Sequence, residues 1–243
     1  MSIFQRKKDP GPLKPADPEE AVNTPIVREE ITMAVNPRSQ IAEQFRSLRN
    51  SITALNPSGA PRSIVVTSAV RGEGKTVATI NLALSMVEVP GTHVLVVDAD
   101  LHAPAIEHYL GLPRRQGLVE LLRGECSPDV AIRPTSVKGV SILGAGSLPP
   151  NPSQLLGSDR IRAVLNSFKQ RFSYILIDTP EAMTISDASL LGSIADGIIL
   201  VVRLNETPRH YVEQVSHNLE TLGGNLLGTC LTGATMADTA ANY

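Results

Sequence analysis

The sequence predicts an α/β fold in which a doubly wound, mostly parallel sheet has helices on both faces. Apolar runs without polar alternation lie at 63–67, 93–97 and 174–177. Such runs are typical of strands that are buried on both faces of a parallel sheet. Patterns typical of helices separate them, and alternating strands and helices form a parallel sheet. At 243 residues, the chain is long enough for one large domain with a substantial core.

The first half of the chain supplies the sheet's early elements. An amphipathic helix is expected over about 39–55, because apolar residues recur there at helical spacing and Asn-Pro-Ser-Gly at 56–59 ends the pattern. The apolar run at 63–67 predicts a strand, and after a glycine-rich loop a helical pattern extends over 77–87. A second strand follows and ends at Asp98.

The second half continues the alternation. A turn rich in proline at 148–153 separates two of its elements. In chain order we expect a short helix at 118–123, a strand at 140–143, a helix at 161–169, a strand ending at Asp178, a helix at 187–194, a strand at 197–202, a helix at about 208–222 and a last strand at 226–231. These elements complete one α/β domain.

Composition excludes several classes of function. The formal net charge is −2, so no strong field draws the chain to nucleic acid, and the absence of Trp argues against a base-stacking platform. Cys126 and Cys230 suit a reducing compartment. No segment approaches the roughly 20 apolar residues of a membrane span. We therefore expect a cytoplasmic protein with no direct membrane span, whose membrane connection goes through a partner.

The most informative motif is the glycine-rich loop between the first strand and its helix. Gly72 and Gly74 permit a tight turn in which backbone N–H groups converge on an anion at a helix N-terminus. Lys75 is expected to reach the β- and γ-phosphates of a nucleotide, and the Thr76 hydroxyl to hold Mg²⁺. Ala69 stands where the usual pattern has its first Gly. The predicted nucleotide contacts are Arg71, Gly72, Glu73, Gly74, Lys75, Thr76 and Val77.

Acidic residues follow two other predicted strands. Asp98 and Asp100 end one apolar run, and Asp178 ends another. Because ligands of such sheets bind beyond the carboxyl ends of the strands, we expect these side chains near the loop. Carboxylates there can hold Mg²⁺ directly or through water, and can accept a proton from a nucleophile. We therefore predict Asp100 and Asp178 beside Thr76 at the metal, and Lys75, Asp98, Asp100 and Asp178 as catalytic residues.

The chain divides into three parts. Residues 1–37 hold six of the 18 prolines and charges of both signs, which indicates a flexible arm. Residues 38–232 form the nucleotide-binding domain, beginning with the amphipathic helix. Residues 233–243 have the composition of a flexible end and finish in Tyr243.

These motifs together resemble the bacterial tyrosine autokinases of capsule and exopolysaccharide export, a branch of the deviant phosphate-loop (P-loop) ATPases. The family's loop is similar to 72–76, its Asp-x-Asp motif to 98–100 and its Ile-Asp-Thr-Pro motif to 177–180. The segments 117–124 and 148–155 also look like that branch. The resemblance implies ATP and Mg²⁺ as cofactors, and a membrane-embedded polysaccharide co-polymerase, or chain-length regulator, as partner at the inner membrane.

The same resemblance implies a ring of identical subunits. Glu43, Arg46 and Arg49 match the Glu-x-x-Arg-x-x-Arg pattern that the family uses between subunits, and residues three apart are neighbours on a helix. A solvated helix face is the alternative. The resemblance covers roughly 36–231, and the signature lysine of the partitioning ATPases is absent at Val70.

The sequence also departs from the family. His102 replaces an Arg, and Glu181 stands where a second proline is common. Thr232 stands where the family has an Asn that recognises adenine, so the resemblance implies that Thr232 is a nucleotide contact with weaker recognition of the base. Family members usually end in a tyrosine cluster, whereas here Tyr243 is the one candidate phosphoacceptor in the tail. Three hypotheses remain in order of preference: a tyrosine autokinase, an ATP-binding scaffold that docks on the co-polymerase without tyrosine transfer, and a partitioning or positioning ATPase.

Overall fold

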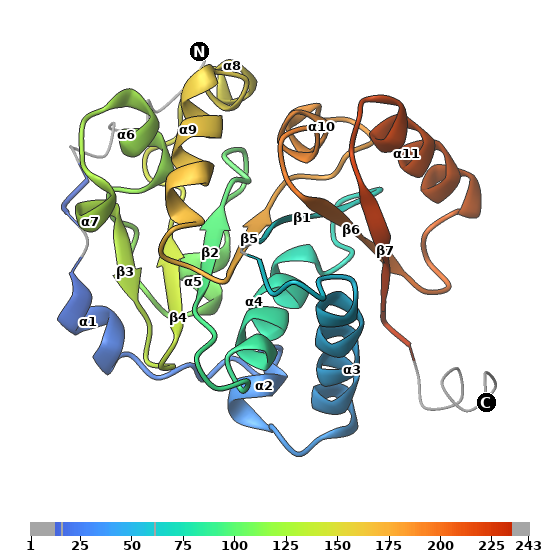
Figure 1. Cartoon of the computed structure of the whole chain (residues 1–243), viewed down its shortest axis with the longest axis horizontal. Helices are drawn as coiled ribbons and strands as arrows, with labels where there is room; N and C mark the ends of the chain where they lie inside the picture. Colours follow the sequence, from blue (N-terminus) through green and yellow to red (C-terminus); the bar gives the residue numbers. More distant parts are fainter. Residues whose placement is uncertain (1–12, 16, 61, 235–243) are drawn as a thin grey trace, which may run out of the picture.

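The computed structural model describes residues 13–15, 17–60 and 62–234. One seven-stranded sheet has the strand order β3-β4-β2-β5-β1-β6-β7 (Figure 1). All neighbouring pairs are parallel except β3 and β4. The strands are β1 (Arg62–Ser68), β2 (Val94–Asp98), β3 (Ile132–Pro134), β4 (Val140–Leu143), β5 (Tyr174–Asp178), β6 (Gly197–Arg203) and β7 (Leu226–Thr232). The predicted fold class is confirmed.

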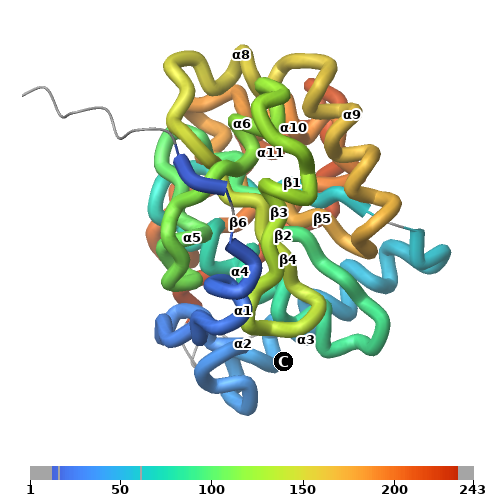
Figure 2. Tube along the Cα trace, turned by 90° about the vertical axis from the view of Figure 1, so that its left-hand side faces the viewer, coloured from blue at the N-terminus to red at the C-terminus, as the bar shows by residue number. Residues whose placement is uncertain are grey.

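Helices cover both faces of this sheet. Apolar residues of α6, α9, α10 and α11 share one core with the sheet, and those of α2, α3, α4 and α5 share the other. Figures 1 and 2 show the two layers on opposite sides of the strands. The helices are α1 (Pro18–Asn23), α2 (Thr32–Val35), α3 (Gln40–Ala54), α4 (Lys75–Met86), α5 (Ile106–Tyr109), α6 (Leu118–Arg123), α7 (Pro128–Ala131), α8 (Pro152–Leu156), α9 (Asp159–Phe168), α10 (Asp187–Gly192) and α11 (Arg209–Thr221).

The described part of the predicted flexible arm is folded, so the prediction is wrong there. Pro18 begins α1 and Asp17 caps it, accepting hydrogen bonds from the N–H groups of Glu19 and Glu20. Proline is well tolerated in the first turn of a helix, where its missing N–H has no intrahelical acceptor. The prolines that suggested flexibility therefore include one that starts a helix.

Buried contacts hold this segment to the domain. Ile31 and Met33 are 0% and 7% exposed and belong to the core shared with α4. Asn81 of α4 accepts from the Met33 N–H and donates to the Glu30 carbonyl oxygen, each over 2.9 Å. A buried amide that is satisfied in this way fixes the backbone of residues 30–33 on α4. Residues 1–12 and 16 of the predicted arm lie outside the described residues.

The structure adds elements that the sequence analysis did not predict. These are the short helices α1, α2, α5, α7 and α8 and the antiparallel strand β3 at one edge of the sheet. Among the described residues, no helix combines the length and apolarity needed to span a bilayer.

Candidate functional site

The three predicted motifs meet at the carboxyl edge of the central strands. β5 lies between β2 and β1, with Asp98 in register with Asp178 and Val66 in register with the same residue. The loop at 69–74 leaves β1 at this edge and leads into α4. The structure thus places the loop and both acidic strand ends side by side, as the sequence analysis predicted.

Two glycines shape the loop. Gly72 and Gly74 both have a φ of +90°, a conformation that side-chain-bearing residues rarely adopt. Gly74 caps α4, so the N–H groups of the helix's first turn have no acceptor within the helix. Lys75 is the first residue of α4 and is 7% exposed, whereas Arg71 is exposed and Val77 is half-buried. This loop can present several N–H donors and one lysine to an anion.

Thr76 and Asp178 form the centre of the site. The Thr76 hydroxyl donates to Asp178 Oδ2 over 2.6 Å. Asp178 is 1% exposed, and its Oδ1 atom has no hydrogen-bond partner among the described residues. A buried carboxylate oxygen without a donor is costly unless a ligand supplies the missing partner.

Asp98 has a similar environment. Its Oδ2 accepts from the N–H groups of Ala105 and Ile106, each over 3.0 Å, while Oδ1 is buried without a partner in the described part of the chain. The carboxylate therefore fixes the start of α5. Asp100 is half-buried, and its Oδ1 accepts from the N–H groups of His102 and Ala103 over 3.3 and 2.9 Å. Of these two carboxylates, Asp100 is the one open to solvent.

Burial and repulsion between carboxylates raise the pKa values of Asp98 and Asp178 at this edge of the sheet. Burial raises the pKa of Asp178 to about 7, with a further contribution from the charge of Asp100, against the opposing effects of Thr76 and Lys75. Burial and the charge of Asp178 raise the pKa of Asp98 well above its usual value. In both cases the protein holds a carboxyl group where its charged form lacks compensation.

The donor set fits a hard divalent cation. Among the described residues, Asp98 Oδ1 and Asp178 Oδ1 are buried without a hydrogen-bond partner, and the Thr76 hydroxyl is bound to the other oxygen of Asp178. Mg²⁺ prefers oxygen ligands and is usually bound by one or two carboxylates together with water and phosphate oxygens. No group of three or more His, Cys, Asp and Glu side chains among the described residues could hold a metal alone. A cation here would take its remaining ligands from water or from a bound phosphate.

Glu73 and Thr232, two of the predicted nucleotide contacts, make side-chain contacts within the protein, and their contact with nucleotide stays a prediction. Glu73 is 1% exposed, and its carboxylate accepts from the Val70 and Arg203 N–H groups and the Thr207 hydroxyl. The Thr232 hydroxyl donates to the Glu73 carbonyl oxygen over 2.7 Å. Both side chains therefore serve the internal structure of the loop, because local acceptors and donors already occupy them.

The structure gives His102 a partner that the sequence analysis missed. His102 Nε2 lies 3.1 Å from Asp187 Oδ2, and the Ser153 hydroxyl donates to Asp187 Oδ1. Asp187 is 0% exposed and joins three segments at the same edge of the sheet. Its position at the start of a helix shortly after the Asp178 strand was the only signal in the sequence.

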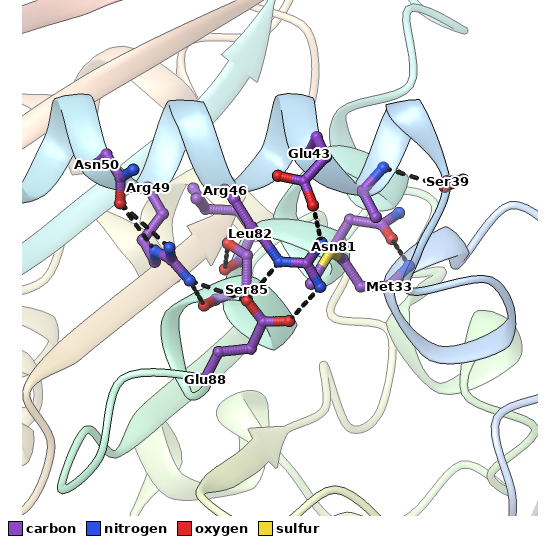
Figure 3. Close-up of polar contacts among 11 residues, drawn as sticks. Met33, Ser39, Glu43, Arg46, Arg49, Asn50, Asn81, Leu82, Ser85 and Glu88 are labelled. Carbon is purple, nitrogen blue, oxygen red and sulfur yellow. Dashed lines mark hydrogen bonds and ion pairs between the residues drawn. The ribbon is translucent and has the colours of Figure 1, made fainter.

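The strip predicted to act between subunits is paired within the chain (Figure 3). Arg46 contacts Glu43 and Glu88, while Arg49 donates to Glu88 and to the Ser85 carbonyl oxygen. Glu43 is 67% exposed at its side chain, against 21% for Arg46 and 14% for Arg49. Only Glu43 is therefore fully presented to a neighbouring molecule. Tyr243 lies outside the described residues.

The strand order, the glycine-rich loop and the carboxylate edge, formed by Asp98 and Asp178 at the ends of β2 and β5, together define a phosphate-loop ATPase. The family model described as "AAA domain" matches residues 61–227. The tyrosine-protein kinase YwqD of Bacillus subtilis (strain 168) is 31% identical over 197 residues, which cover 81% of this chain and 83% of that protein. The chain belongs to the bacterial tyrosine-protein kinase family of these ATPases.

Solved structures agree with this assignment. The kinase domain of the Escherichia coli tyrosine kinase ETK superimposes with a TM-score of 0.80 and 28% identity, covering 84% of this chain and 80% of that one. The septum site-determining protein MinD of Pyrococcus horikoshii OT3, complexed with Mg-ADP, gives a TM-score of 0.61 at 28% identity, covering 73% of each chain. Membership of the P-loop ATPases implies that this chain binds nucleotide.

Proposed function

We propose that this chain is an ATP-dependent protein tyrosine autokinase that regulates exopolysaccharide or capsule synthesis and export. The observation that carries the proposal is the Thr76–Asp178 hydrogen bond beside Lys75, together with carboxylate oxygens on β2 and β5 that have no partner in the described part of the chain. These are the parts that phosphoryl transfer needs: a phosphate-binding loop, a cation and oxygen ligands. Relatives that are named tyrosine-protein kinases support the choice of acceptor.

The proposed cofactors are ATP and Mg²⁺. Gly72, Gly74 and the first turn of α4 bind the phosphates through their N–H groups, and Lys75 stabilises their charge. Thr76 and Asp178 hold the cation, with Asp100 nearby. When bound, ATP·Mg²⁺ supplies the transferable phosphoryl group and neutralises charge on its oxygens. The protein's own contribution is positioning and electrostatic stabilisation.

Asp100 is the proposed acceptor of the tyrosine proton. An incoming phenol has an ordinary pKa near 10, so a nearby carboxylate assists chiefly as the O–H bond breaks during transfer. Asp100 is half-buried and accessible from solvent, whereas Asp98 is 0% exposed and caps α5. Asp98 therefore acts in positioning the loop after β2 and in holding charge near the cation.

Tyr243 is the proposed phosphoacceptor, supplied to the active site of a neighbouring subunit. A homo-oligomeric ring, with Glu43, Arg46 and Arg49 at or near the contact, would bring the tail of one subunit to the next. The proposed partner is a membrane-embedded polysaccharide co-polymerase, which would hold the cytoplasmic kinase at the inner membrane. These proposals rest on the family resemblance and on the similarity to known tyrosine-protein kinases.

One observation favours a second function, an ATP-binding scaffold without tyrosine transfer. His102 stands where the family has an Arg, and Asp187 together with Ser153 holds its imidazole. A histidine offers less reliable positive charge than an arginine at neutral pH. If the charge at this position is needed for transfer, the chain would bind and exchange nucleotide without phosphorylating tyrosine.

Peptide mass spectrometry after incubation with ATP and Mg²⁺ tests the two functions. We expect phosphate on Tyr243 in the wild type and none in Lys75→Ala. Lys138→Ala is a matched control, because Lys138 is exposed and precedes β4, at the opposite edge of the sheet. Absence of phosphotyrosine despite ATP turnover, also in the presence of a candidate membrane activator, would contradict the kinase and favour the scaffold.

A further inference from the structure

The Glu73 carboxylate is buried inside the loop that is proposed to hold a polyphosphate. It is 1% exposed, and its Oε2 accepts from the Val70 N–H over 2.7 Å. Its Oε1 accepts from the Arg203 N–H over 3.1 Å and from the Thr207 hydroxyl. One side chain thus joins the loop after β1 to the segment 203–207, which begins at the last residue of β6 and ends before α11.

A carboxylate at this place opposes the binding of another anion, so its presence needs a physical reason. Coulomb repulsion from a buried negative charge acts on any phosphate nearby, because the protein interior screens weakly. Three donors compensate Glu73, and they come from two separate segments. The Val70 N–H is consequently occupied and does not contribute to a phosphate cradle. The Glu73 carboxylate instead connects the loop after β1 to residues 203–207.

The backbone of Glu73 makes a second connection. The Thr232 hydroxyl donates to the Glu73 carbonyl oxygen over 2.7 Å, and the Thr232 carbonyl oxygen accepts from the Leu204 N–H over 2.9 Å. The loop, the end of β6 and the end of β7 therefore form one hydrogen-bonded unit. The C-terminal tail, residues 233–243, follows Thr232 directly, and the described residues end at Ala234.

We infer that Glu73 is a positioning residue that couples occupancy of the phosphate loop to residues 203–207 and to the start of the C-terminal tail. The inference rests on the proposed function, because it takes a phosphate to be the ligand of the loop. Phosphate binding to the N–H groups of the loop fixes the loop backbone. The Glu73 carboxylate then restricts the Arg203 amide through its hydrogen bond. The Glu73 carbonyl oxygen restricts Thr232, which directly precedes the C-terminal tail.

Magnesium pyrophosphate tests the coupling, because it occupies the phosphate site and has no base or sugar to touch 203–207 directly. Hydrogen exchange of individual amides is measured by NMR with and without this ligand. We expect protection of residues 72–76 together with about tenfold slower exchange of the Arg203 amide. Thr207→Val removes one donor to Glu73 at nearly constant volume and should reduce the effect at Arg203 to less than about twofold. Thr207→Ser keeps the hydroxyl and should restore it.

The outcomes separate this inference from the proposed function. Protection of 72–76 without slower exchange at Arg203 in the wild type would overturn the coupling and leave the phosphate site intact. Lack of protection at both places would overturn the phosphate site and the coupling with it. Equal protection at Arg203 in wild type and Thr207→Val, with Glu73→Gln behaving in the same way, would show that another route connects the segments. Urea unfolding of each variant controls for a general loss of stability.

Discussion

Carboxylates occupy opposite environments in two regions of this protein. At the carboxyl edge of the sheet, Asp98 and Asp178 are buried and each keeps one oxygen without a partner among the described residues. Arg46 and Arg49 of α3 form ion pairs with Glu88, which lies just after the end of α4 and close to solvent (Figure 3). The carboxylates at the sheet edge lack a positive partner, and a ligand can supply one. The charges on α3 are already paired within the chain.

The pKa values express the same difference. Burial raises the pKa of Asp178 to about 7, so its charged form is disfavoured in the ligand-free protein. The hydrogen bond from Arg46 lowers the pKa of Glu88, so its charged form is favoured. Buried charge without compensation marks a place built for a ligand, whereas a solvated ion pair is satisfied and is weakened by salt. The comparison predicts that changes at the edge affect nucleotide chemistry far more than changes on α3.

Lys75→Ala should have the largest effect. Loss of the lysine removes the main positive side chain of the loop, and removal of one such electrostatic group typically costs about 10²–10³ in rate. We expect ATP turnover, followed as phosphate released or transferred, to fall by at least that factor. Lys138→Ala should leave the rate within about twofold, because surface charges far from a site have small effects. A normal rate in Lys75→Ala would show that the loop is not the phosphate site.

Asp178→Asn should change the pH dependence of stability in the ligand-free protein. The folded-state pKa of about 7 lies above the ordinary value of 3.8. The contribution of the Asp178 carboxyl group to the free energy of unfolding is therefore fully present below about pH 4 and is lost as pH rises through 7. The variant cannot ionise. Its free energy of unfolding in urea, relative to wild type, should rise between about pH 5 and 8 by on the order of 2 kcal/mol.

A matched substitution controls for that result. Asp129 is 79% exposed at its side chain and pairs with Arg171 on the surface, so Asp129→Asn should show little change over the same pH range. If the free energies of unfolding of Asp178→Asn and Asp129→Asn follow the same pH dependence as wild type, the pKa of Asp178 is not raised by folding. The comparison between the two regions then fails.

The α3 strip should influence assembly rather than chemistry. Combined replacement of Glu43, Arg46 and Arg49 by Ala removes the charged strip that the resemblance places between subunits. If the proposed ring forms, we expect sedimentation velocity to show its shift toward monomer in this variant, with little change in the affinity for ADP and Mg²⁺. An unchanged distribution of sedimentation coefficients would show that the strip is a solvated helix face.

Glu88→Gln should give the smallest effect and separates the two roles of the arginines. It removes the shared partner of Arg46 and Arg49 but leaves both guanidinium groups in place. We expect the dissociation constant of magnesium ADP to stay within about twofold, because these pairs are close to solvent. A large loss of nucleotide affinity, measured by calorimetry, would show that α3 acts on the phosphate loop through α4.

Local pattern was enough to predict the frame of the molecule. The strands β1, β2 and β5 are buried apolar runs, and the acidic residues at the ends of β2 and β5 meet the loop because parallel strands align their carboxyl ends. Short elements such as β3 and α5 were missed, since three or four residues carry too little periodicity. The docked arm was also missed, because its buried Ile31 and Met33 depend on distant partners on α4.

The finer features of the site depend on contacts between distant residues. Glu73 is held by Arg203 and Thr207, and His102 by Asp187. In the sequence Glu73 is part of a phosphate-loop motif, and nothing in its immediate neighbours indicates that its carboxylate turns inward. Likewise, the charge spacing on α3 is visible in sequence, whereas the intrachain partner Glu88 is provided only by the packing of α3 on α4.

The central claim is that the carboxyl groups of Asp98 and Asp178 lack compensating positive charge until a cation binds. The most direct measurement is calorimetric titration with magnesium ADP at about pH 6.5 in two buffers of different ionisation enthalpy. Because Asp178 has a pKa of about 7 when ligand-free and must ionise to hold a cation, binding should release protons, and affinity should rise with pH through 7. Asp178→Asn should release fewer protons. Tight binding with the same heat in both buffers, and no dependence on pH, would contradict the claim.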